Sequence, residues 1–162
     1  MQSAAYNFIA LMKHPVKFRI FLLLKLPVAF FSGVRIENMD EDSCAVRIPY
    51  KWFTQNPFHS TYFACLAMAA EMSTGALAMA HIYKRIPGIS MLVIKLEATY
   101  FKKAIGKTVF VCAQGQEFKN AIQKAVDSGE PQTVSAKSTG RNKQGEIVAE
   151  FFVTWSFKAK GN

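Results

Sequence analysis

Closely spaced cysteines are missing from this chain. Cys44, Cys65 and Cys112 are an odd number, and no two of them form a Cys-x-x-Cys pair. Structural zinc sites use such pairs and disulfide frameworks use an even number of cysteines, so we expect neither. The simplest interpretation is a cytoplasmic protein with reduced thiols and no bound metal ion.

Acidic residues are missing from the first 36 positions. That segment holds Lys13, Lys17, Arg19, Lys25 and Arg35, and the whole chain has a formal net charge of +9. An excess of positive charge favours anionic partners such as nucleic acid, phospholipid or a phosphate-bearing coenzyme. Aromatic and basic residues do not interleave in the manner of a nucleic-acid platform, so nucleic acid is not an expected partner.

An uninterrupted apolar run long enough to cross a membrane is also missing. The run at 20–31 is short and contains Lys25 and Pro27, whereas a spanning helix needs about 20 apolar residues. The run at 56–82 approaches that length but carries Glu71 near its middle. A charged side chain at the bilayer centre costs about 2.5–3.5 kcal/mol on insertion scales. We therefore predict that neither run spans a membrane.

Linkers, internal repeats and low-complexity stretches are absent as well. With 162 residues, of which 51% are hydrophobic, the chain is long enough for one good core and too short for two. We predict one globular domain overall, in which residues 1–31 form an N-terminal helical extension and residues 32–162 form the main domain.

Hydrophobic spacing predicts helices in the first half of the chain. Residues 3–13 have helical spacing, and residues 16–30 form a second helical or irregular apolar piece. Residues 61–82 are predicted to form a helix with Ser60 or Thr61 as its N-cap. This helix is apolar almost all round, so other parts of the protein must enclose it. Its many alanines make it thin enough for a close approach.

Alternating residues predict strands on both sides of that helix. Residues 34–48 have the pattern of a hairpin with an acidic turn, and residues 91–101 form a strand after the helix. In residues 107–114 the apolar Val109, Val111 and Ala113 share one face.

Residues 116–130 return briefly to helical spacing. The last hairpin covers residues 132–157, and its second arm alternates through Ile147, Ala149, Phe151, Val153, Trp155 and Phe157. We predict an α+β protein in which an antiparallel sheet curls around the central helix.

Two local patterns add a family resemblance to this element order. Asn56 stands fifteen residues before Glu71, and residues 98–113 form an alternating strand that ends in an aromatic-basic-small run before a turn, with Lys102 and Lys103 in the run. Over roughly residues 32–158 the chain resembles the hotdog fold. Within that fold it looks most like the PaaI-type acyl-CoA thioesterases, and more closely like a little-characterised, mostly bacterial group of thioesterase-like hotdog proteins.

The resemblance implies a catalytic arrangement. PaaI-type enzymes have an asparagine, a His-Gly-Gly six residues later, and an acid nine residues after that histidine. Here the corresponding residues are Asn56, then Tyr62, Phe63 and Ala64, then Glu71. Glu71 is expected to be the general base or nucleophile, the amides of Phe63 and Ala64 to hold the oxyanion, and Asn56 to position water or the carbonyl.

The resemblance also implies where substrate binds. The substrate is expected to be an acyl-CoA or acyl-carrier-protein thioester, with coenzyme A as part of the substrate and no separate cofactor. Lys102, Lys103 and Arg141 are candidates for contacts with phosphate. His59, Tyr62 and Thr74 are candidates for other contacts with the substrate.

Each of these roles has an alternative. Glu71 is also consistent with a carboxylate paired across a dimer interface, and Thr74 with a hydroxyl that bonds back to the helix backbone. Asn56 before proline is a common turn residue. Because Tyr62, Phe63 and Ala64 replace His-Gly-Gly, a protein that binds acyl-CoA without hydrolysing it is the second candidate function.

Two further expectations concern assembly and the N-terminal extension. A sheet with two free edges and an all-round apolar helix predicts a homodimer, possibly paired into a tetramer. The extension is predicted to pack across the back of the sheet as a lid. Peripheral contact of the extension with anionic lipid is the less favoured alternative.

Overall fold

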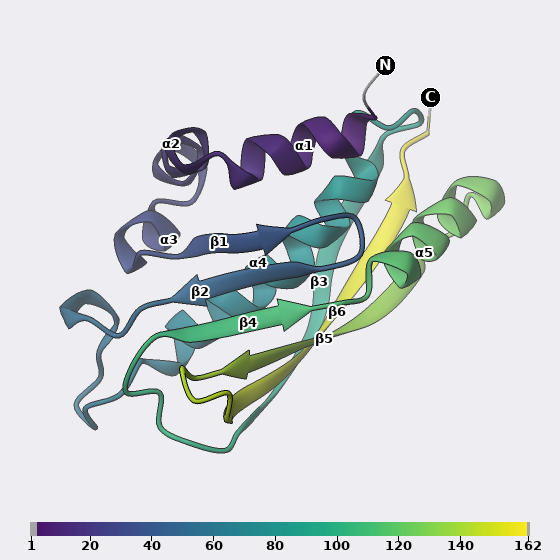
Figure 1. The fold of residues 1–162 in the computed structure, drawn as a ribbon. Helices are drawn as coiled ribbons and strands as arrows, with labels where there is room; N and C mark the ends of the chain where they lie inside the picture. Colours follow the sequence, from purple (N-terminus) through teal and green to yellow (C-terminus); the bar gives the residue numbers. More distant parts are fainter. Residues whose placement is uncertain (1–2, 162) are drawn as a thin grey trace.

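A curved antiparallel sheet wraps around one long helix in the computed structural model, which describes residues 3–161 (Figure 1). The long helix is α4 (Phe63–Ile82). Three short helices precede the sheet: α1 (Ala4–Lys13), α2 (Pro15–Lys25) and α3 (Pro27–Ser32). The strands are β1 (Arg35–Met39), β2 (Cys44–Ile48), β3 (Ile89–Tyr100), β4 (Thr108–Cys112), β5 (Gln132–Arg141) and β6 (Ile147–Ala159). A 3-10 turn, η1 (Trp52–Thr54), and a helix, α5 (Gly115–Ser128), complete the described part of the chain.

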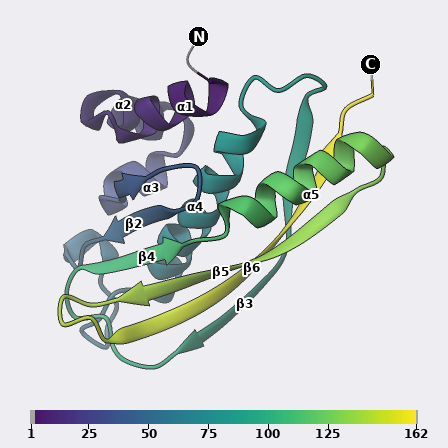
Figure 2. The same cartoon turned by 45° about the vertical axis from the view of Figure 1, so that its right-hand side comes forward.

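The six strands lie in the order β1-β2-β4-β5-β6-β3, with every pair antiparallel (Figure 2). This confirms the predicted antiparallel sheet. The long strand β3 is therefore an edge strand, although it comes directly after α4 in the sequence. The register of the β3–β6 pair shifts between Val93 and Lys95, and such an irregularity increases the local twist of a strand.

The concave face of the sheet and α4 form the core. Phe110, Phe151 and Phe157 are completely buried, and so are Ala69 and Ala78 of α4. Small residues on the helix let the aromatic side chains of the strands fill the space between helix and sheet, as the composition predicted. By length and composition alone α4 resembles a membrane span, but most of it is buried inside the protein. The three cysteines are buried and free.

Helix α4 begins two residues later than predicted, and its N-cap prediction is wrong. The N-cap is Tyr62, which makes no side-chain capping bond. Ser60 Oγ instead donates to Asn56 Oδ1 at 3.2 Å, and Thr61 Oγ1 donates to the carbonyl of Ala104 at 3.1 Å. Both hydroxyls hold the loop before the helix, so they are not available to cap it.

The buried face predicted from alternation is correct for β6, whereas in β4 the buried face is the opposite one. In β6 the alternating residues from Ala149 to Phe157 are buried, and Phe151, Val153 and Phe157 are completely buried. Ile147 is the exception, because it is only half-buried while its neighbour Val148 is completely buried. In β4 the core side is formed by Thr108, Phe110 and Cys112, so the apolar face predicted from residues 109–113 lies on the outer side of the sheet. Alternation identifies two faces of a strand but does not say which one the helix covers.

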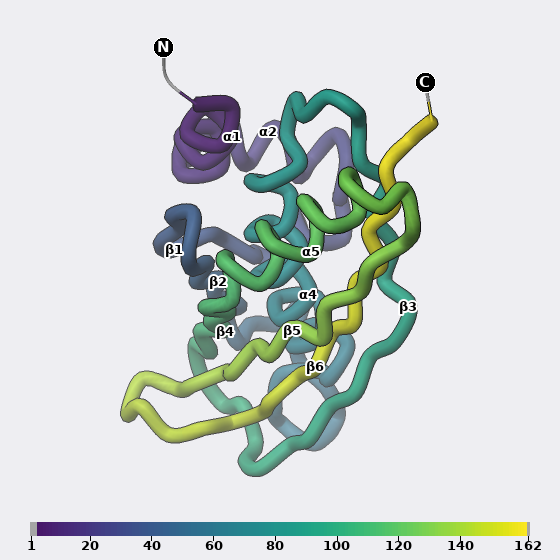
Figure 3. Tube along the Cα trace, turned by 90° about the vertical axis from the view of Figure 1, so that its right-hand side faces the viewer, coloured from purple at the N-terminus to yellow at the C-terminus, as the bar shows by residue number. Residues whose placement is uncertain are grey.

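The N-terminal helices do not pack across the back of the sheet, which corrects the predicted location of the lid. Helix α1 contacts α4 and β1, on the helix side of the sheet (Figures 1 and 3). Phe8, Phe18 and Leu22 are buried there, and the ring of Phe8 lies 5.2 Å from that of Tyr83. The sheet leaves one flank of α4 uncovered, and the extension buries its apolar side against that flank.

Two leucines of α2 test whether the extension is part of the folded core. Leu22 is 0% exposed and Leu24 is 71% exposed. We expect Leu22→Ala to lower the free energy of unfolding by about 2–5 kcal/mol, because it leaves a cavity. The matched Leu24→Ala is expected to change it by at most about 0.5 kcal/mol. Urea unfolding measures both, and equal effects would show that α2 is not held in its described position.

Candidate functional site

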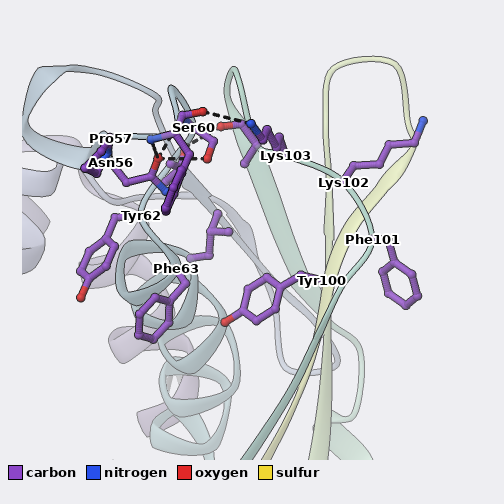
Figure 4. Close-up of a pocket in the computed structure, with 13 residues that line it drawn as sticks. Asn56, Pro57, Ser60, Tyr62, Phe63, Tyr100, Phe101, Lys102 and Lys103 are labelled. Carbon is purple, nitrogen blue, oxygen red and sulfur yellow. Dashed lines mark hydrogen bonds between the residues drawn. The ribbon is translucent and has the colours of Figure 1, made fainter.

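The loop before α4 is organised by one side chain. Asn56 Oδ1 accepts hydrogen bonds from the backbone amides of Phe58 at 3.0 Å and Ser60 at 3.2 Å, in addition to the Ser60 hydroxyl (Figure 4). The chain passes through a left-handed conformation at His59, where φ is +58°. Asn56 therefore stabilises the turn, which is one of the two roles that the sequence suggested for it.

The start of α4 presents free backbone donors. Within residues 3–161, the amides of Phe63 and Ala64 have no hydrogen-bond acceptor, because Tyr62 provides no cap. The N-terminal end of a helix carries a partial positive charge. These two amides are therefore placed to bind an oxygen that becomes negative during a reaction.

A cavity of about 580 Å³ lies beside these amides, and we call it the helix-start cavity. Its walls come from residues 56–58, 60–63, 66 and 100–104. The rings of Tyr62 and Phe63 lie 4.9 Å apart, and Tyr100 points toward them from the end of β3 (Figure 4). Exposed aromatic side chains therefore narrow the approach to the amides.

The candidate phosphate-binding residues divide into two groups. Lys102 and Lys103 line the helix-start cavity; Lys102 pairs with Glu146, and Lys103 Nζ donates to the carbonyl of Phe58 at 3.2 Å. Arg141 Nη1 instead donates to the carbonyl of Gly145 across the hairpin turn, at 2.9 Å. The structure brings the two lysines to the cavity, whereas neither Arg141 nor His59 lines it.

Glu71 lies in a different cavity. It is eight residues along α4 from Phe63, which places it about 12 Å away along the helix axis. We call its surroundings the Glu71 cavity, a space of about 430 Å³ between α1, α2, α4 and β6. Apart from Glu71 the walls are apolar or aromatic, and they include Phe8, Phe18 and Trp155.

The Glu71 carboxylate has no partner among residues 3–161, either as an ion pair or as a hydrogen bond. Burial raises the pKa of Glu71 above its ordinary value of 4.5. Gly75 makes room for it one turn further along the helix. A Cβ at Gly75 would lie 3.2 Å from Glu71 Oε1 and 3.0 Å from the indole ring of Trp155.

A short hydrogen-bond chain fixes the wall behind the carboxylate. Trp155 Nε1 donates to Thr74 Oγ1 at 2.9 Å, and Thr74 Oγ1 donates to the carbonyl of Glu71 at 2.9 Å. The hydroxyl of Thr74 thus bonds back to the helix backbone, which was the alternative to its role in substrate binding. Sequence reasoning missed Trp155 and Gly75 as parts of this site. The available signal was a glycine one helical turn after a lone glutamate.

One chain therefore holds the free amides and the carboxylate in two separate places. Phe63, at the start of α4, lines the helix-start cavity, and Glu71 lines the Glu71 cavity. Two turns of helix separate them, which is too far for both groups to contact one reacting carbonyl within the same chain. No group of three or more His, Cys, Asp or Glu side chains comes together in the part of the chain that the structure describes.

Known structures identify the fold. The chain superposes on PA5026 of Pseudomonas aeruginosa, a protein of unknown function described as a "Probable Thioesterase", with a TM-score of 0.77 and 20% identity over 93% of this chain and 99% of that one. It also superposes on the thioesterase HI1161 of Haemophilus influenzae, with a TM-score of 0.63 and 14% identity over 86% and 88% of the two chains. The protein has the hotdog fold, as the resemblance implied.

The family follows from the sequence. The family described as Domain of unknown function (DUF4442) matches residues 17–157, and this chain belongs to that family. The match begins within α2, so it includes most of the second helix and all of the third. No curated protein matches the chain by sequence.

The pKa of Glu71 has a measurable effect on stability. A carboxyl whose pKa is higher in the folded state binds its proton more tightly when folded, so the folded state loses stability as pH rises from about 4 toward the raised pKa. Glu71→Gln removes this loss. We expect the stability of the variant relative to the wild type to increase between acidic and neutral pH, as measured by urea unfolding at several pH values. A difference that does not depend on pH would show that Glu71 titrates normally.

Proposed function

We propose that this protein hydrolyses an acyl thioester, either an acyl-CoA or an acyl-carrier-protein thioester, and that it acts as a homodimer. The observation that carries the proposal is the unpaired carboxylate of Glu71 in the wall of an otherwise apolar cavity. Glu71 is half-buried, and acids that are partly withdrawn from water without a partner are uncommon unless they are used in chemistry.

Glu71 supplies the base in this mechanism. A carboxylate with a raised pKa accepts a proton near neutral pH more readily than an ordinary one. It removes a proton from water while the water oxygen attacks the thioester carbonyl carbon. The tetrahedral intermediate then expels the thiolate, which takes up a proton, and the products are a carboxylic acid and a free thiol. Direct attack by the carboxylate is the alternative route to the same products.

The partner subunit completes the site. The edge strand β3 exposes Leu92, Ile94 and Leu96, and its outer side has no strand paired to it among the described residues. Pairing β3 with the same strand of a second copy covers this edge in a two-fold arrangement. In this dimer the amides at Phe63 of one subunit and the carboxylate of Glu71 of the other act on the same substrate. A shared site of this kind accounts for the separation of the two groups within one chain.

The two cavities suit the two ends of the substrate. The Glu71 cavity is apolar and matches an acyl group. A second concavity of about 500 Å³ adjoins the helix-start cavity at Lys102 and Lys103, and Lys107 and Lys143 also line it. Glu146 also lines this concavity and pairs with Lys102. Four lysines beside one carboxylate leave an excess of positive charge, which matches the phosphates of coenzyme A or of a phosphopantetheine arm.

Thiol release from a panel of acyl-CoA thioesters tests the reaction. We expect Glu71→Ala to lower kcat by about 10²–10⁴-fold, the usual contribution of a positioned base. Glu130 lies exposed in the turn after α5, so Glu130→Ala is the matched control and should retain full activity. Turnover that survives the loss of Glu71 removes this residue from the mechanism.

Mixed dimers test whether each site uses two subunits. Phe63→Pro removes one amide at the first helical position, where proline is tolerated, and Tyr62 already has the extended ψ of 134° that precedes proline. Phe63→Ala keeps the amide and is its control. Glu71→Ala and Phe63→Pro dimers should each be inactive. After reassortment they should regain about a quarter of wild-type activity, because half of the dimers are mixed and each has one intact site of two.

Failure to regain activity would place both groups of a site in one subunit. The dimer itself is checked first by light scattering. A monodisperse monomer at micromolar concentration contradicts the shared site directly.

A binding protein without hydrolysis is the second candidate. The exposed rings of Tyr62 and Phe63 stand where the related enzymes have His-Gly, and they narrow the way to the amides. Under this candidate the protein binds acyl-CoA stoichiometrically and releases no thiol over hours. Phe63→Gly together with Ala64→Gly would then produce turnover, because these changes remove the side chains at both positions while the two amides remain.

A further inference from the structure

The outer side of the N-terminal helices is a second apolar surface, separate from the Glu71 cavity. Helices α2 and α3 lie at the opposite end of the molecule from α5 (Figures 1 and 2). We call the surface the outer apolar face, and its members are each at least 46% exposed: Val16, Ile20, Leu23, Leu24, Val28, Phe31, Trp52 and Phe53.

This face is continuous. Helix α2 contacts α3, and α3 contacts η1. The ring of Phe53 lies 6.1 Å from that of Phe31 and 6.5 Å from that of Trp52. Single exposed apolar residues are ordinary, but a contiguous group of this size marks a surface that binds something.

A pocket of about 320 Å³ borders the outer apolar face. Five cationic side chains line it: Arg19, Arg35, Arg47, Lys51 and Lys107. We call it the basic pocket. Arg19 is followed directly by Ile20, and Lys51 is followed directly by Trp52, so the pocket and the apolar face share a border on two elements.

Positive charge in the basic pocket is only partly balanced. Glu37 contacts Lys107 at 2.8 Å and Arg47 at 3.8 Å. Among residues 3–161, Arg19, Arg35 and Lys51 form no ion pair with a carboxylate. Five cations beside one carboxylate repel one another, and a bound anion with several oxygen acceptors relieves that repulsion.

Arg19 is held in place by the fold. Its guanidinium lies 3.7 Å from the ring centre of Phe30, and its Nη1 donates to the carbonyl of Phe30 at 3.0 Å. A Cβ at Gly33 would lie 2.9 Å from Lys51 Nζ. The glycine therefore lets the ammonium group approach the backbone. A fixed arginine beside lysine groups suits a phosphate group.

We propose that the outer apolar face docks on the surface of an anionic phospholipid bilayer, with a lipid phosphate in the basic pocket. Leu24, Val28 and Trp52 then enter the boundary between headgroups and acyl chains, where aromatic and aliphatic side chains are favourable. Lys17 and Lys25 of α2 add attraction to the negative surface. No acidic residue occurs before Glu37 to oppose it.

A second copy of the chain is a poorer occupant of this face. A two-fold contact brings the same surface of both subunits together, so each basic pocket and its lysines would face the other. The resulting repulsion favours a negatively charged partner. This inference goes beyond hydrolysis and does not depend on it, because it uses the outer side of α2 and not the side that lines the Glu71 cavity. The basic pocket shares only Lys107 with the concavity proposed for the coenzyme phosphates, and none of the variants below changes Lys107.

Sedimentation of the full-length protein with vesicles tests the proposal. We expect binding to vesicles of phosphatidylglycerol and phosphatidylcholine in equal parts, much weaker binding to phosphatidylcholine alone, and release by added salt. Arg35→Gln and Lys51→Gln should each weaken partitioning by about five-fold. Lys124 is an exposed residue of α5, far from this face. Lys124→Gln is therefore the charge-matched control, and it should weaken partitioning much less than either of the other two variants.

Apolar variants separate a bilayer from a soluble phosphate. Leu24→Ser with Trp52→Ser should abolish vesicle binding, whereas Ile105→Ser, which alters an equally exposed residue elsewhere, should not. Circular dichroism confirms that each variant is folded. Calorimetric titration of the protein with inorganic pyrophosphate, at matched ionic strength, measures whether the basic pocket binds a soluble phosphate.

Three results would overturn the proposal. The first is equal binding, or none, to neutral and anionic vesicles. The second is pyrophosphate binding that Lys51→Gln removes while no vesicle binding occurs, which would show a site for soluble phosphate only. The third is an oligomer that the double serine variant dissociates and that does not bind vesicles, which would show that the face joins copies of the chain. Thioesterase activity is unaffected by these outcomes and is judged by its own assay.

Discussion

The close contact between α4 and the concave face of the sheet is the interaction on which the rest of the structure depends. Alanines such as Ala69 and Ala78 let the strands approach the helix, and Phe110, Phe151 and Phe157 fill the space between them. The sheet covers only part of the circumference of a helix that is apolar almost all round. The uncovered flank has to be buried by other means, and α1, α2 and the Glu71 cavity lie along it.

This constraint explains where the unusual carboxylate lies. Glu71 faces the flank that the sheet does not cover, and its neighbours are apolar side chains of α1, α2 and β6. Burial without a partner raises its pKa, and Gly75 and Trp155 define the space around it. The free amides at the start of α4 face a different cavity. A single chain thus holds the carboxylate and the free amides at two separate places.

The N-terminal extension has two sides with different chemistry. Phe8, Phe18 and Leu22 are buried against the core, whereas Leu24 and Val28 are exposed beside a pocket of cations. The lid and the lipid-binding segment were alternative interpretations of one sequence. In three dimensions the two interpretations concern opposite sides of the same helices, because a helix presents different residues to each side. One side is buried against the core, and the exposed side is the one that we propose binds lipid.

Local patterns were enough to predict the class of fold, the single glutamate of the central helix and the order of the elements. Periodicity and side-chain size are local properties, and they were sufficient for α4, α5 and the hairpin of β5 and β6. Which face of β4 is buried depends on packing in three dimensions, since both faces carry apolar residues. The same packing sets the start of α4, because Ser60 and Thr61 form long-range and loop hydrogen bonds in place of a cap. The separation of Glu71 from the amides, and the roles of Trp155 and Gly75 in its cavity, depend on contacts between residues far apart in the chain, and no local pattern encodes those.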